Sequence, residues 1–321
     1  MLLIITEENA GKRLDAVIFE NAPEETTRGS IQNQILEGEV RVNKKRITRK
    51  SEKVKAGDRI VIHFAEKEPE YIPVAENIPL NILFENDDLL IISKESGMCT
   101  HPDNTYKSGT VVNAVMGHLK NHLQEFIDEE TVRPGIVHRL DKDTSGCLMI
   151  AKNKKTHRYL SKIIAERKVT KKYQTLVLGR VPSKKGTIDS PITRDPHNRE
   201  RMTTLKNAKA KDALTHFECI AQYPQPTATL VDVHIITGRT HQIRVHFAAI
   251  GHPVYGDDLY GNPKVNAAYC LQFKTDRMFL HAKSLSFELE NGETISVESP
   301  LPPELQTILD SMEIDESYTT E

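Results

Sequence analysis

The sequence has few cysteines, no CxxC pair and no long apolar run. Its four cysteines lie far apart, which argues against a zinc ribbon or a redox dithiol and predicts reduced, structural thiols. No apolar stretch approaches the roughly 18 residues of a membrane-spanning helix. The opening MLLIITEEN turns acidic too early for a secretory signal peptide. We therefore predict a folded, soluble protein of the cytoplasm that makes no membrane contact.

Two nucleotide-binding motifs are also missing. The chain has no GxxxxGKS or GxxxxGKT loop to hold a triphosphate, and no GxGxxG turn after a strand to hold a dinucleotide. Chemistry that depends on ATP or on a nicotinamide or flavin dinucleotide is therefore not indicated.

The formal net charge of −2 excludes a uniformly basic surface, so contact with a nucleic acid needs local basic patches. Two basic runs provide them. Residues 41–59 contain nine Lys or Arg and two acids, and residues 152–172 contain nine Lys or Arg and one acid. Such runs are also typical of an ordinary solvated face, so they permit RNA binding without establishing it.

Residues 1–65 predict a small domain of two short helices and strands. The apolar faces of the two helices are formed by Leu14, Ile18 and Phe19 in the first and by Ile31, Ile35 and Leu36 in the second. Gly38 is placed to end the second helix. Strand-like alternation follows at residues 40–42 and 59–62, with a turn between them at residues 43–45.

This N-terminal region resembles the S-four-type RNA-binding module, named after a small-subunit ribosomal protein. The resemblance rests on the stretches KRLD, TRGSIQNQILEGEVRVNKK and VKAGDRIVI. It implies RNA binding, and the side chains expected to face phosphate are Arg13, Arg28, Ser30, Gln34 and Lys44. The same pattern also fits a small cap that has no ligand.

The rest of the chain predicts a second, larger domain. The acidic, proline-containing stretch at residues 66–79 indicates a linker, and the larger domain is expected over residues 80–303. Strand-like runs at residues 89–93, 147–152, 173–179 and 229–237 outnumber helices, of which those at residues 159–164 and 243–250 stand out. We predict an α+β protein, in which a small N-terminal α/β module precedes a domain built on a mixed, largely antiparallel sheet.

The last residues, 304–321, form an acidic tail without Lys or Arg. This tail is either disordered or forms a short helix that packs back through Leu305, Ile308 and Leu309. The sequence does not decide between the two.

One loop of the larger domain carries candidate catalytic side chains. In RPGIVHRLDKDTSGCLMIAKN, Arg139 and Asp141 lie between two apolar, strand-like runs, and catalytic groups are often held on such loops by a rigid scaffold. Read alone, the loop favours a simpler interpretation, in which Asp141 caps a turn or pairs with Arg139.

The context of the loop changes this interpretation. HRLDKDTSG resembles the signature of RluA-type pseudouridine synthases, and further stretches resemble the same family in the same order. These are SGMCTHP before the loop, and after it VTKKYQTLVLG, TGRTHQIRVHFAAIGHPVYGDDLYG and FLHAKSLSF. The resemblance covers roughly residues 80 to 300, and the S-four-type module commonly accompanies this catalytic domain. It implies an isomerase that converts uridine to pseudouridine in RNA.

The reaction implied by the resemblance detaches uracil from ribose at a ring nitrogen, turns the base and re-attaches it through ring carbon five. It involves no net oxidation, hydrolysis or phosphoryl transfer, so no cofactor and no metal are expected. It needs a carboxylate nucleophile, an acceptor for the proton on ring carbon five, and a cation to keep the carboxylate ionised.

Three catalytic residues follow from the matching motif positions. Asp141 is the nucleophile, although the sequence does not decide whether it attacks the sugar or assists departure of the base. Arg244 matches the arginine that pairs with this aspartate; on the residues alone it could also lie on the exposed side of its helix. Tyr173 matches the tyrosine that stacks on the uracil and serves as an acid-base group; on the residues alone it also fits a strand aromatic in a core.

Folded RNA hides its bases, so the target nucleotide has to be turned out of its stack. Arg139 matches the family residue that fills the vacated space, since a guanidinium can stack on bases and bind phosphate at once. Arg239, His241 and Gln242 are expected either to contact the RNA backbone or to support the side chains that contact it.

Two other functions compete with this interpretation. A non-catalytic RNA-binding or ribosome-associated factor would share the basic runs but would not need Asp141, Tyr173 and Arg244 together. A hydrolytic glycosidase would need two cooperating carboxylates, and Asp143 is the obvious second one. The N-terminal module and the motifs resemble the RluD-like branch that modifies large-subunit ribosomal RNA, so we expect that substrate, with transfer RNA as the alternative, and a monomer.

Overall fold

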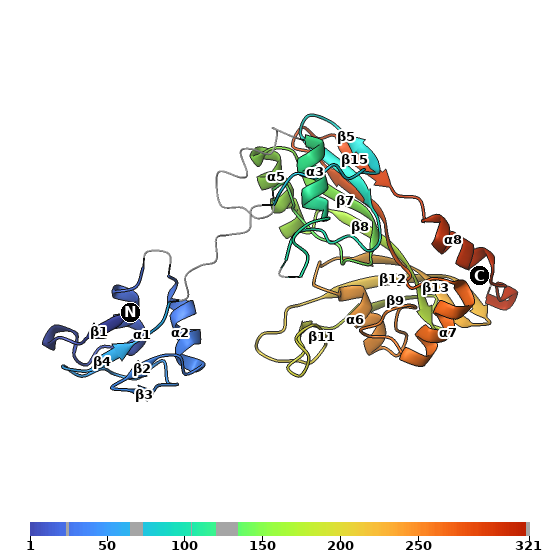
Figure 1. Ribbon diagram of the computed structural model, residues 1–321. Coiled ribbons are helices and arrows are strands. Elements are labelled where there is room, and N and C mark those ends of the chain that lie inside the picture. The colour runs from blue at the N-terminus through green and yellow to red at the C-terminus, as the bar shows by residue number, and fades with distance from the viewer. Residues whose placement is uncertain (24–25, 65–72, 104, 120–133, 319–321) are drawn as a thin grey trace. The chain divides into compact units, whose positions relative to one another are not determined.

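The computed structural model describes residues 1–23, 26–64, 73–103, 105–119 and 134–318 (Figure 1). The chain divides into two compact units, Met1–Glu70 and Tyr71–Glu321. The division lies inside the stretch that the sequence predicts as a linker. Across the described ranges, no helix is long and apolar enough to cross a membrane.

The first unit packs two α-helices and a short 3-10 helix with a small antiparallel sheet. Its sheet has the order β1 (Leu2–Ile4), β4 (Arg59–Val61), β2 (Arg41–Val42) and β3 (Lys45–Arg46). Its helices are η1 (Glu7–Asn9), α1 (Leu14–Glu20) and α2 (Arg28–Leu36). The hydroxyl of Thr27 caps α2 by accepting from the backbone N–H of Ser30, 3.2 Å away.

The core of this unit confirms part of the predicted helical faces. Leu14, Ile18, Ile31 and Ile35 have no exposed surface. The prediction was wrong for the residues that directly follow two of them, since Phe19 is 45% exposed and Leu36 is 52% exposed. A helix turns by about 100° per residue, which carries each of these side chains off the buried face.

The second unit is built on one large sheet. Its described strands follow the spatial order β5 (Ile82–Glu85), β6 (Leu89–Lys94), β7 (Ser145–Ala151), β14 (Leu280–Glu288), β8 (Thr170–Leu178), β13 (Thr227–Ile235), β12 (Leu214–Pro224) and β9 (Lys185–Asp189), with β15 (Thr294–Glu298) paired to β14. Among the described pairs only β7 and β14 are parallel. The predicted mixed, largely antiparallel sheet is therefore confirmed. A separate two-stranded ribbon joins β10 (Thr193–Arg194) to β11 (Met202–Thr203).

The sheet is covered on both faces at β6 and β7, which explains why their sequences are unbroken apolar runs. Leu90 packs in a core with α3 (Val111–Leu119), whereas its neighbour Leu89 packs in a core with α5 (Lys154–Ala165). Figure 1 shows α3 and α5 near one end of the sheet, and α7 (Pro263–Phe273) with α8 (Pro303–Asp310) near the other.

Helix α6 (Gln242–Ala249) confirms the helix predicted at residues 243–250. Ile243 and Phe247 are buried in the same core as α3. Gly251, with a φ of +87°, follows the helix in a conformation that suits glycine. Ile250 is 41% exposed because it lies past the last helical turn. Helices α3 and α7 were not singled out in the sequence.

The two ends of the second unit are fastened to it. The backbone of Glu76, within the predicted linker, donates to Asn113 O (3.0 Å), and the side chain of Asn113 donates to Val74 O (2.8 Å). At the other end, α8 buries Leu305 and Ile308 in a core with Tyr269, and a short helix η3 (Glu316–Tyr318) follows. Of the two alternatives for the acidic tail, the structure shows the helix that packs back.

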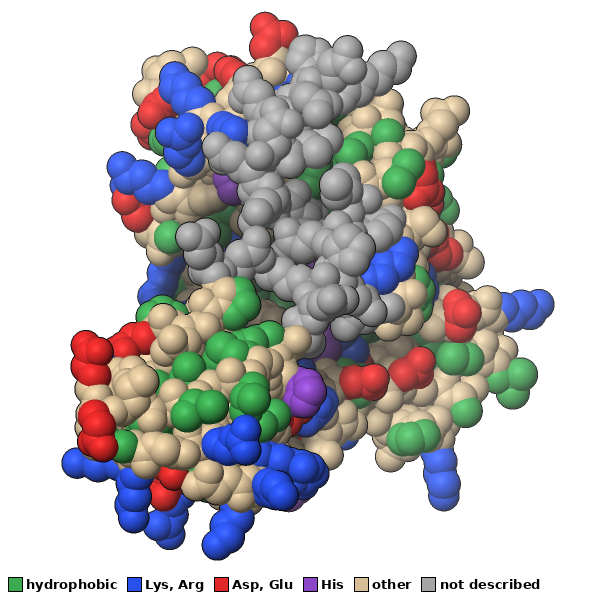
Figure 2. Space-filling view, turned by 60° about the vertical axis from the view of Figure 1, so that its left-hand side comes forward, with side chains coloured by type: hydrophobic (Ala, Val, Ile, Leu, Met, Phe, Trp, Pro, Cys, Tyr) green, Lys and Arg blue, Asp and Glu red, His purple; other side chains and the backbone are tan. Residues whose placement is uncertain are grey.

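The described surface mixes charges of both signs. In the view of Figure 2, Lys and Arg side chains stand among acidic and hydrophobic ones and form no continuous basic coat. This agrees with the net charge of −2.

Candidate active site

The loop that leads into β7 holds Asp141 through buried contacts on either side of it. The hydroxyl of Thr100 donates to Leu140 O (2.8 Å) and accepts from Leu140 N (3.2 Å). The ring Nε2 of His138 accepts from Met149 N (3.1 Å). Burial lowers the pKa of His138 to about 3, so this ring is neutral and remains an acceptor at physiological pH. The backbone on both sides of Arg139 is thereby fixed.

Lys94, at the end of β6, holds the same loop through hydrogen bonds from its ammonium. Its ammonium donates to the carbonyl oxygens of Glu95 (2.8 Å), Met98 (2.8 Å) and Lys142 (2.9 Å). Only 1% of Lys94 is exposed, and burial lowers its pKa to about 7. The residue joins the turn after β6 to the residue that follows Asp141.

Arg244 on α6 reaches Asp141 and a second carboxylate. Its Nη1 donates to Asp141 Oδ2 (3.2 Å), while Nε and Nη2 donate to the two carboxylate oxygens of Asp257 (2.7 and 2.8 Å). Burial alone would lower the pKa of Arg244, but hydrogen bonds and attraction from Asp257, and then from Asp141, raise it above its usual value. The guanidinium therefore stays charged, and Asp257 fixes which of its nitrogens faces Asp141.

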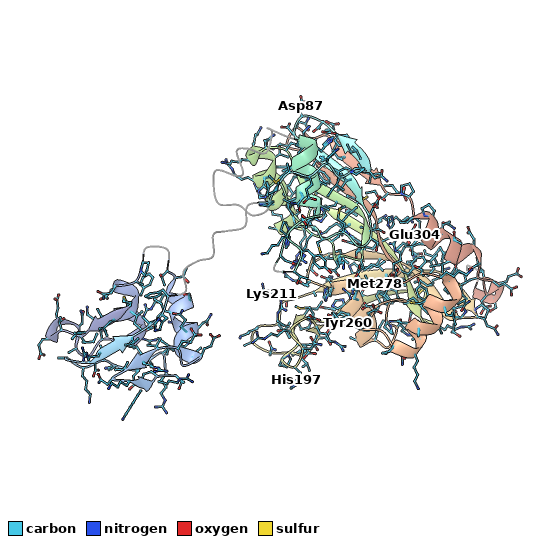
Figure 3. The ribbon with its side chains drawn as sticks, in the orientation of Figure 1. Asp87, His197, Lys211, Tyr260, Met278 and Glu304 are labelled. Carbon is cyan, nitrogen blue, oxygen red and sulfur yellow. The ribbon has the colours of Figure 1, made fainter. Side chains whose placement is uncertain are left out.

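His241 lies on another side of Asp141. The ring Nε2 of His241 lies 3.8 Å from Asp141 Oδ2, and its Nδ1 lies 2.9 Å from the hydroxyl of Tyr260, which Figure 3 labels. The Tyr260 oxygen accepts from Met202 N (2.7 Å), so we assign its proton to the bond with Nδ1. Burial lowers the pKa of His241, so a neutral ring with its proton on Nε2 faces the carboxylate.

Asp141 opens onto a cavity of about 380 Å³, which is large enough for a nucleoside. Tyr173 on β8 lines this cavity and is 7% exposed; burial raises the pKa of its phenol, and the charge of Asp141 raises it further. Among the described residues that line the cavity, Asp141 is the single acid. Asp143, the candidate second carboxylate, is exposed and lies outside this lining, although it lines a neighbouring cavity of about 360 Å³ together with Asp141.

Three other candidate residues, Arg139, Arg239 and Gln242, also line the cavity. Arg139 is exposed and lines the cavity, as does Arg239, whose Nε donates to Asp212 O (2.9 Å). Gln242 also borders the cavity, but it is 3% exposed and its amide is already occupied, which favours the supporting role over a direct RNA contact. Its oxygen accepts from Thr237 Oγ1 and from Arg239 N, and its nitrogen donates to β12, so it supports the loop after β13.

In the N-terminal unit, a buried carboxylate gathers the two candidate arginines. Arg13 donates through Nε and Nη2 to the two oxygens of Asp15 (2.9 and 3.1 Å), and Arg28 Nε donates to Asp15 Oδ2 (3.3 Å). Gln32 adds a further bond of 2.7 Å to the same carboxylate. The side chain of Asp15 has no exposed surface, and its hydrogen bond with Arg13, the largest effect, lowers its pKa well below the usual range.

The three remaining candidates of this unit differ in whether their side chains are free to contact a ligand. Ser30 is exposed in the first turn of α2, and Lys44 is exposed on the turn between β2 and β3 with a φ of +69°. Gln34 donates instead to His63 O of its own unit (3.2 Å), so its amide nitrogen is not directed at a ligand.

Two positioning residues were missed in the sequence, Asp257 and Asp15. Both stand in quoted motifs, Asp257 in GDDLYG and Asp15 in KRLD. The available signal was an acid close to a motif arginine, but in neither case does the sequence show that the carboxylate turns inward.

A hydrogen bond and an ion pair, both made by Arg277, link α8 to the first residue of β7. Arg277 donates to Ser145 Oγ (2.7 Å), at the first residue of β7, and pairs with Glu304, labelled on Figure 3. Ser145 Oγ also lies 2.8 Å from His281 Nδ1. The C-terminal helix is thus connected to the strand that begins where the loop ends.

Comparisons with known proteins identify the family of this chain. The profile described as RNA pseudouridylate synthase matches residues 88–249, and that of the S4 domain matches residues 12–60. An uncharacterized RNA pseudouridine synthase of Aquifex aeolicus is 44% identical over 79% of this chain and 78% of its own length. The ribosomal large subunit pseudouridine synthase D of Nitrosomonas europaea is 37% identical over 97% of this chain and 87% of its own length.

Solved structures give the same answer for the fold. The human RNA pseudouridylate synthase domain containing 1 covers 75% of this chain and 90% of its own, with 26% identity and a TM-score of 0.59. The chain therefore belongs to the RNA pseudouridine synthase family, and it carries an S4 domain at its N-terminus. It is an isomerase that converts uridine to pseudouridine in RNA.

Proposed function

We propose that this enzyme isomerises selected uridines of large-subunit ribosomal RNA and uses Asp141 as its catalytic carboxylate. One observation carries the assignment of Asp141. Among the described residues lining the nucleoside-sized cavity it is the only acid, and it shares that cavity with Tyr173 while Arg244 bonds it at 3.2 Å.

The proposed reaction conserves every atom of the nucleotide. The bond from ribose C1′ to uracil N1 breaks, a bond from C1′ to uracil C5 forms, and the proton leaving C5 is balanced by one that N1 gains. Asp141 either adds to C1′ or assists departure of the base, and both routes need an anionic carboxylate next to C1′. Arg244, held by Asp257, supplies the adjacent positive charge and the orientation.

Tyr173 has the role of a neutral phenol in this proposal. Because burial raises its pKa, the hydroxyl keeps its proton at physiological pH. Its ring is suited to stack on the uracil, and its O–H is suited to donate a hydrogen bond to the base or to relay a proton.

Arg139 is the proposed residue for base flipping. It is exposed at the rim of the cavity, two residues before Asp141, and its planar guanidinium can occupy the stack that the target base leaves. Arg239 and His241 line the same cavity, with Arg239 suited to the RNA backbone and His241 suited to hold Asp141.

The choice of substrate rests on relatives. The enzymes of Nitrosomonas europaea and Neisseria meningitidis, 37% and 34% identical to this chain, are named ribosomal large subunit pseudouridine synthase D. The S4 domain adds a second RNA-binding surface, expected to use Arg13, Arg28, Ser30 and Lys44. The proposal includes a monomer that works in the cytoplasm, where such RNA is assembled into ribosomes.

The experiment that tests the function is a pseudouridine map of in vitro transcribed ribosomal and transfer RNA. The RNAs are incubated with the wild-type protein and, separately, with Asp141→Asn, which keeps the shape and removes the charge. New pseudouridines in large-subunit RNA with the wild type alone are the expected result. Release of free uracil would identify a hydrolase instead, and RNA binding without any modification would identify a non-catalytic factor.

A further inference from the structure

Lys171 on β8 is a buried cation that the proposed chemistry does not use. It is 7% exposed and lines the cavity that contains Asp141 and Tyr173. In the described part of the chain, neither a carboxylate nor another hydrogen-bond acceptor pairs with its ammonium. Burial lowers its pKa, and its charge in turn lowers the pKa of His138 and of His234. Burying an ammonium without a partner is costly, so a partner from outside the protein is indicated.

Gly238 keeps space open in front of this ammonium. A Cβ at position 238 would lie 3.4 Å from Lys171 Nζ, at van der Waals distance, so the loop after β13 passes directly beside the ammonium. The φ of Gly238 is not in the left-handed region, so the backbone conformation does not call for glycine there. Gly238 therefore places no side chain beside Lys171.

Two arginines line the same cavity as Lys171. Arg239 directly follows Gly238, and Arg167 follows the end of α5. Arg167 has a φ of +60°, in a position after a helix where glycine or asparagine is preferred. Arg167 is exposed, so its guanidinium is available to the cavity.

From these observations we propose that Lys171, with Arg167 and Arg239, forms a subsite for a backbone phosphate of the RNA beside the flipped uridine. The inference rests on the proposed function and deepens it by naming the group that holds the nucleotide in place. Gly238 adds no side chain next to Lys171, and the two arginines line the same cavity.

A phosphate fits this subsite better than a carbonyl oxygen of the uracil. A full negative charge offsets the desolvation of a buried ammonium, which a neutral carbonyl does only in part. Lysine is a common point-charge ligand for phosphate. Asp141 does not compete for the ammonium, because its carboxylate is engaged by Arg244.

The neighbouring Lys172 is a natural control. Successive residues of a strand point to opposite faces of the sheet, and Lys172 is exposed while Lys171 is buried. Lys172 is absent from the lining of the Asp141 cavity and lines a separate depression with His234 and His216. The basic run at residues 152–172 thus contains two adjacent lysines with different surroundings.

The first test measures RNA affinity at several salt concentrations. Wild type, Lys171→Met and Lys172→Met are titrated with in vitro transcribed large-subunit ribosomal RNA. For Lys171→Met we expect a loss of affinity of about tenfold or more, and a slope of log affinity against log salt that is smaller by about 0.7–0.9, as for one lost phosphate contact. Lys172→Met is expected to keep the wild-type affinity and slope.

A loss of RNA affinity in Lys171→Met is not expected to result from a loss of folding. Because Lys171→Met removes a buried charge that has no protein partner, its melting temperature is expected to equal or exceed that of the wild type. An unchanged slope together with a slower reaction at saturating RNA would overturn the phosphate subsite, since it would place Lys171 at the base. The wild-type pseudouridine map decides the proposed function separately, because the salt slope is measured on binding alone.

A second test locates the phosphate once the target uridine is mapped. Oligonucleotides are made in which one linkage at a time next to that uridine is a neutral methylphosphonate. At one linkage, the losses of affinity caused by the methylphosphonate and by Lys171→Met should not add, because both remove the same contact. Additive losses at every linkage would refute the subsite. Arg167→Gly, which relieves the left-handed conformation, is expected to weaken binding by severalfold without lowering the melting temperature.

Discussion

The two units of this enzyme both use a buried aspartate to hold arginine, but to different ends. Asp257 binds Arg244, whose side chain is 12% exposed and reaches inward to Asp141. Asp15 binds Arg13 and Arg28, whose side chains are 45% and 48% exposed and remain open to solvent. The same ion pair thus fixes one geometry inside the catalytic unit and presents two cations on the surface of the S4 domain.

The difference lies in what the aspartate leaves unoccupied. Asp257 occupies Nε and Nη2 of one guanidinium and directs the remaining nitrogen, Nη1, at a single oxygen of Asp141. Asp15 is shared among Arg13, Arg28 and Gln32 and brings its two arginines side by side. Catalysis needs a defined position to within fractions of an ångström, whereas phosphate binding tolerates several arrangements of the same charge.

The largest expected effect is on Asp257. Asp257→Asn removes the charge that fixes Arg244, so single-turnover pseudouridine formation at saturating RNA is expected to fall about a hundredfold or more, with RNA affinity nearly unchanged. The adjacent, exposed Asp258 offers a matched control, and Asp258→Asn is expected to react at the wild-type rate. A wild-type rate for Asp257→Asn would contradict the positioning role.

The next largest effect is expected for Asp15, where RNA affinity should change and the single-turnover rate should not. Asp15→Asn loosens Arg13 and Arg28 and is expected to weaken RNA binding by about tenfold, while the single-turnover rate at saturating RNA stays unchanged. Glu20→Gln, an exposed acid on the same helix, serves as the control. If Asp15→Asn slowed the chemical step instead, the two aspartates would not be separable in the way described here.

Low pH should lower the stability of the S4 domain, because Asp15 becomes protonated when the domain unfolds. The folded-state pKa of Asp15 is depressed, so its stabilising effect is complete above its unfolded pKa of about 4 and is lost as the pH falls below that value. We expect hydrogen exchange in α1 to report about 1 kcal/mol less stability for the wild type at pH 3 than at pH 6. In Asp15→Asn this part of the pH dependence should be absent, and its persistence would assign the effect to other acids.

The smallest effect separates the two surface arginines. Arg13 makes two bonds to Asp15, whereas Arg28 makes one at 3.3 Å. Lysine keeps the charge but cannot form the paired bonds, so Arg13→Lys is expected to cost about threefold in RNA affinity and Arg28→Lys less. Equal losses for the two variants would show that charge alone matters at this surface.

The sequence was informative where a motif or a periodic pattern fixes the answer. The helices α5 and α6, the strands β6, β7, β8 and β13, and the grouping of Asp141, Tyr173 and Arg244 around one cavity were all anticipated. It was less informative where a side chain had two directions available. Phe19 and Leu36 are exposed, and Gln242 is turned into the protein.

By itself, the sequence determined the chemistry, because the order of its motifs specifies which residue types are brought together. Only the tertiary structure decided which of two neighbouring residues of the same kind turns inward: Asp257 and not Asp258, Lys171 and not Lys172. The reason is physical. Adjacent residues share composition, charge and motif, and they differ only in the packing and hydrogen bonds that distant segments supply when the chain folds.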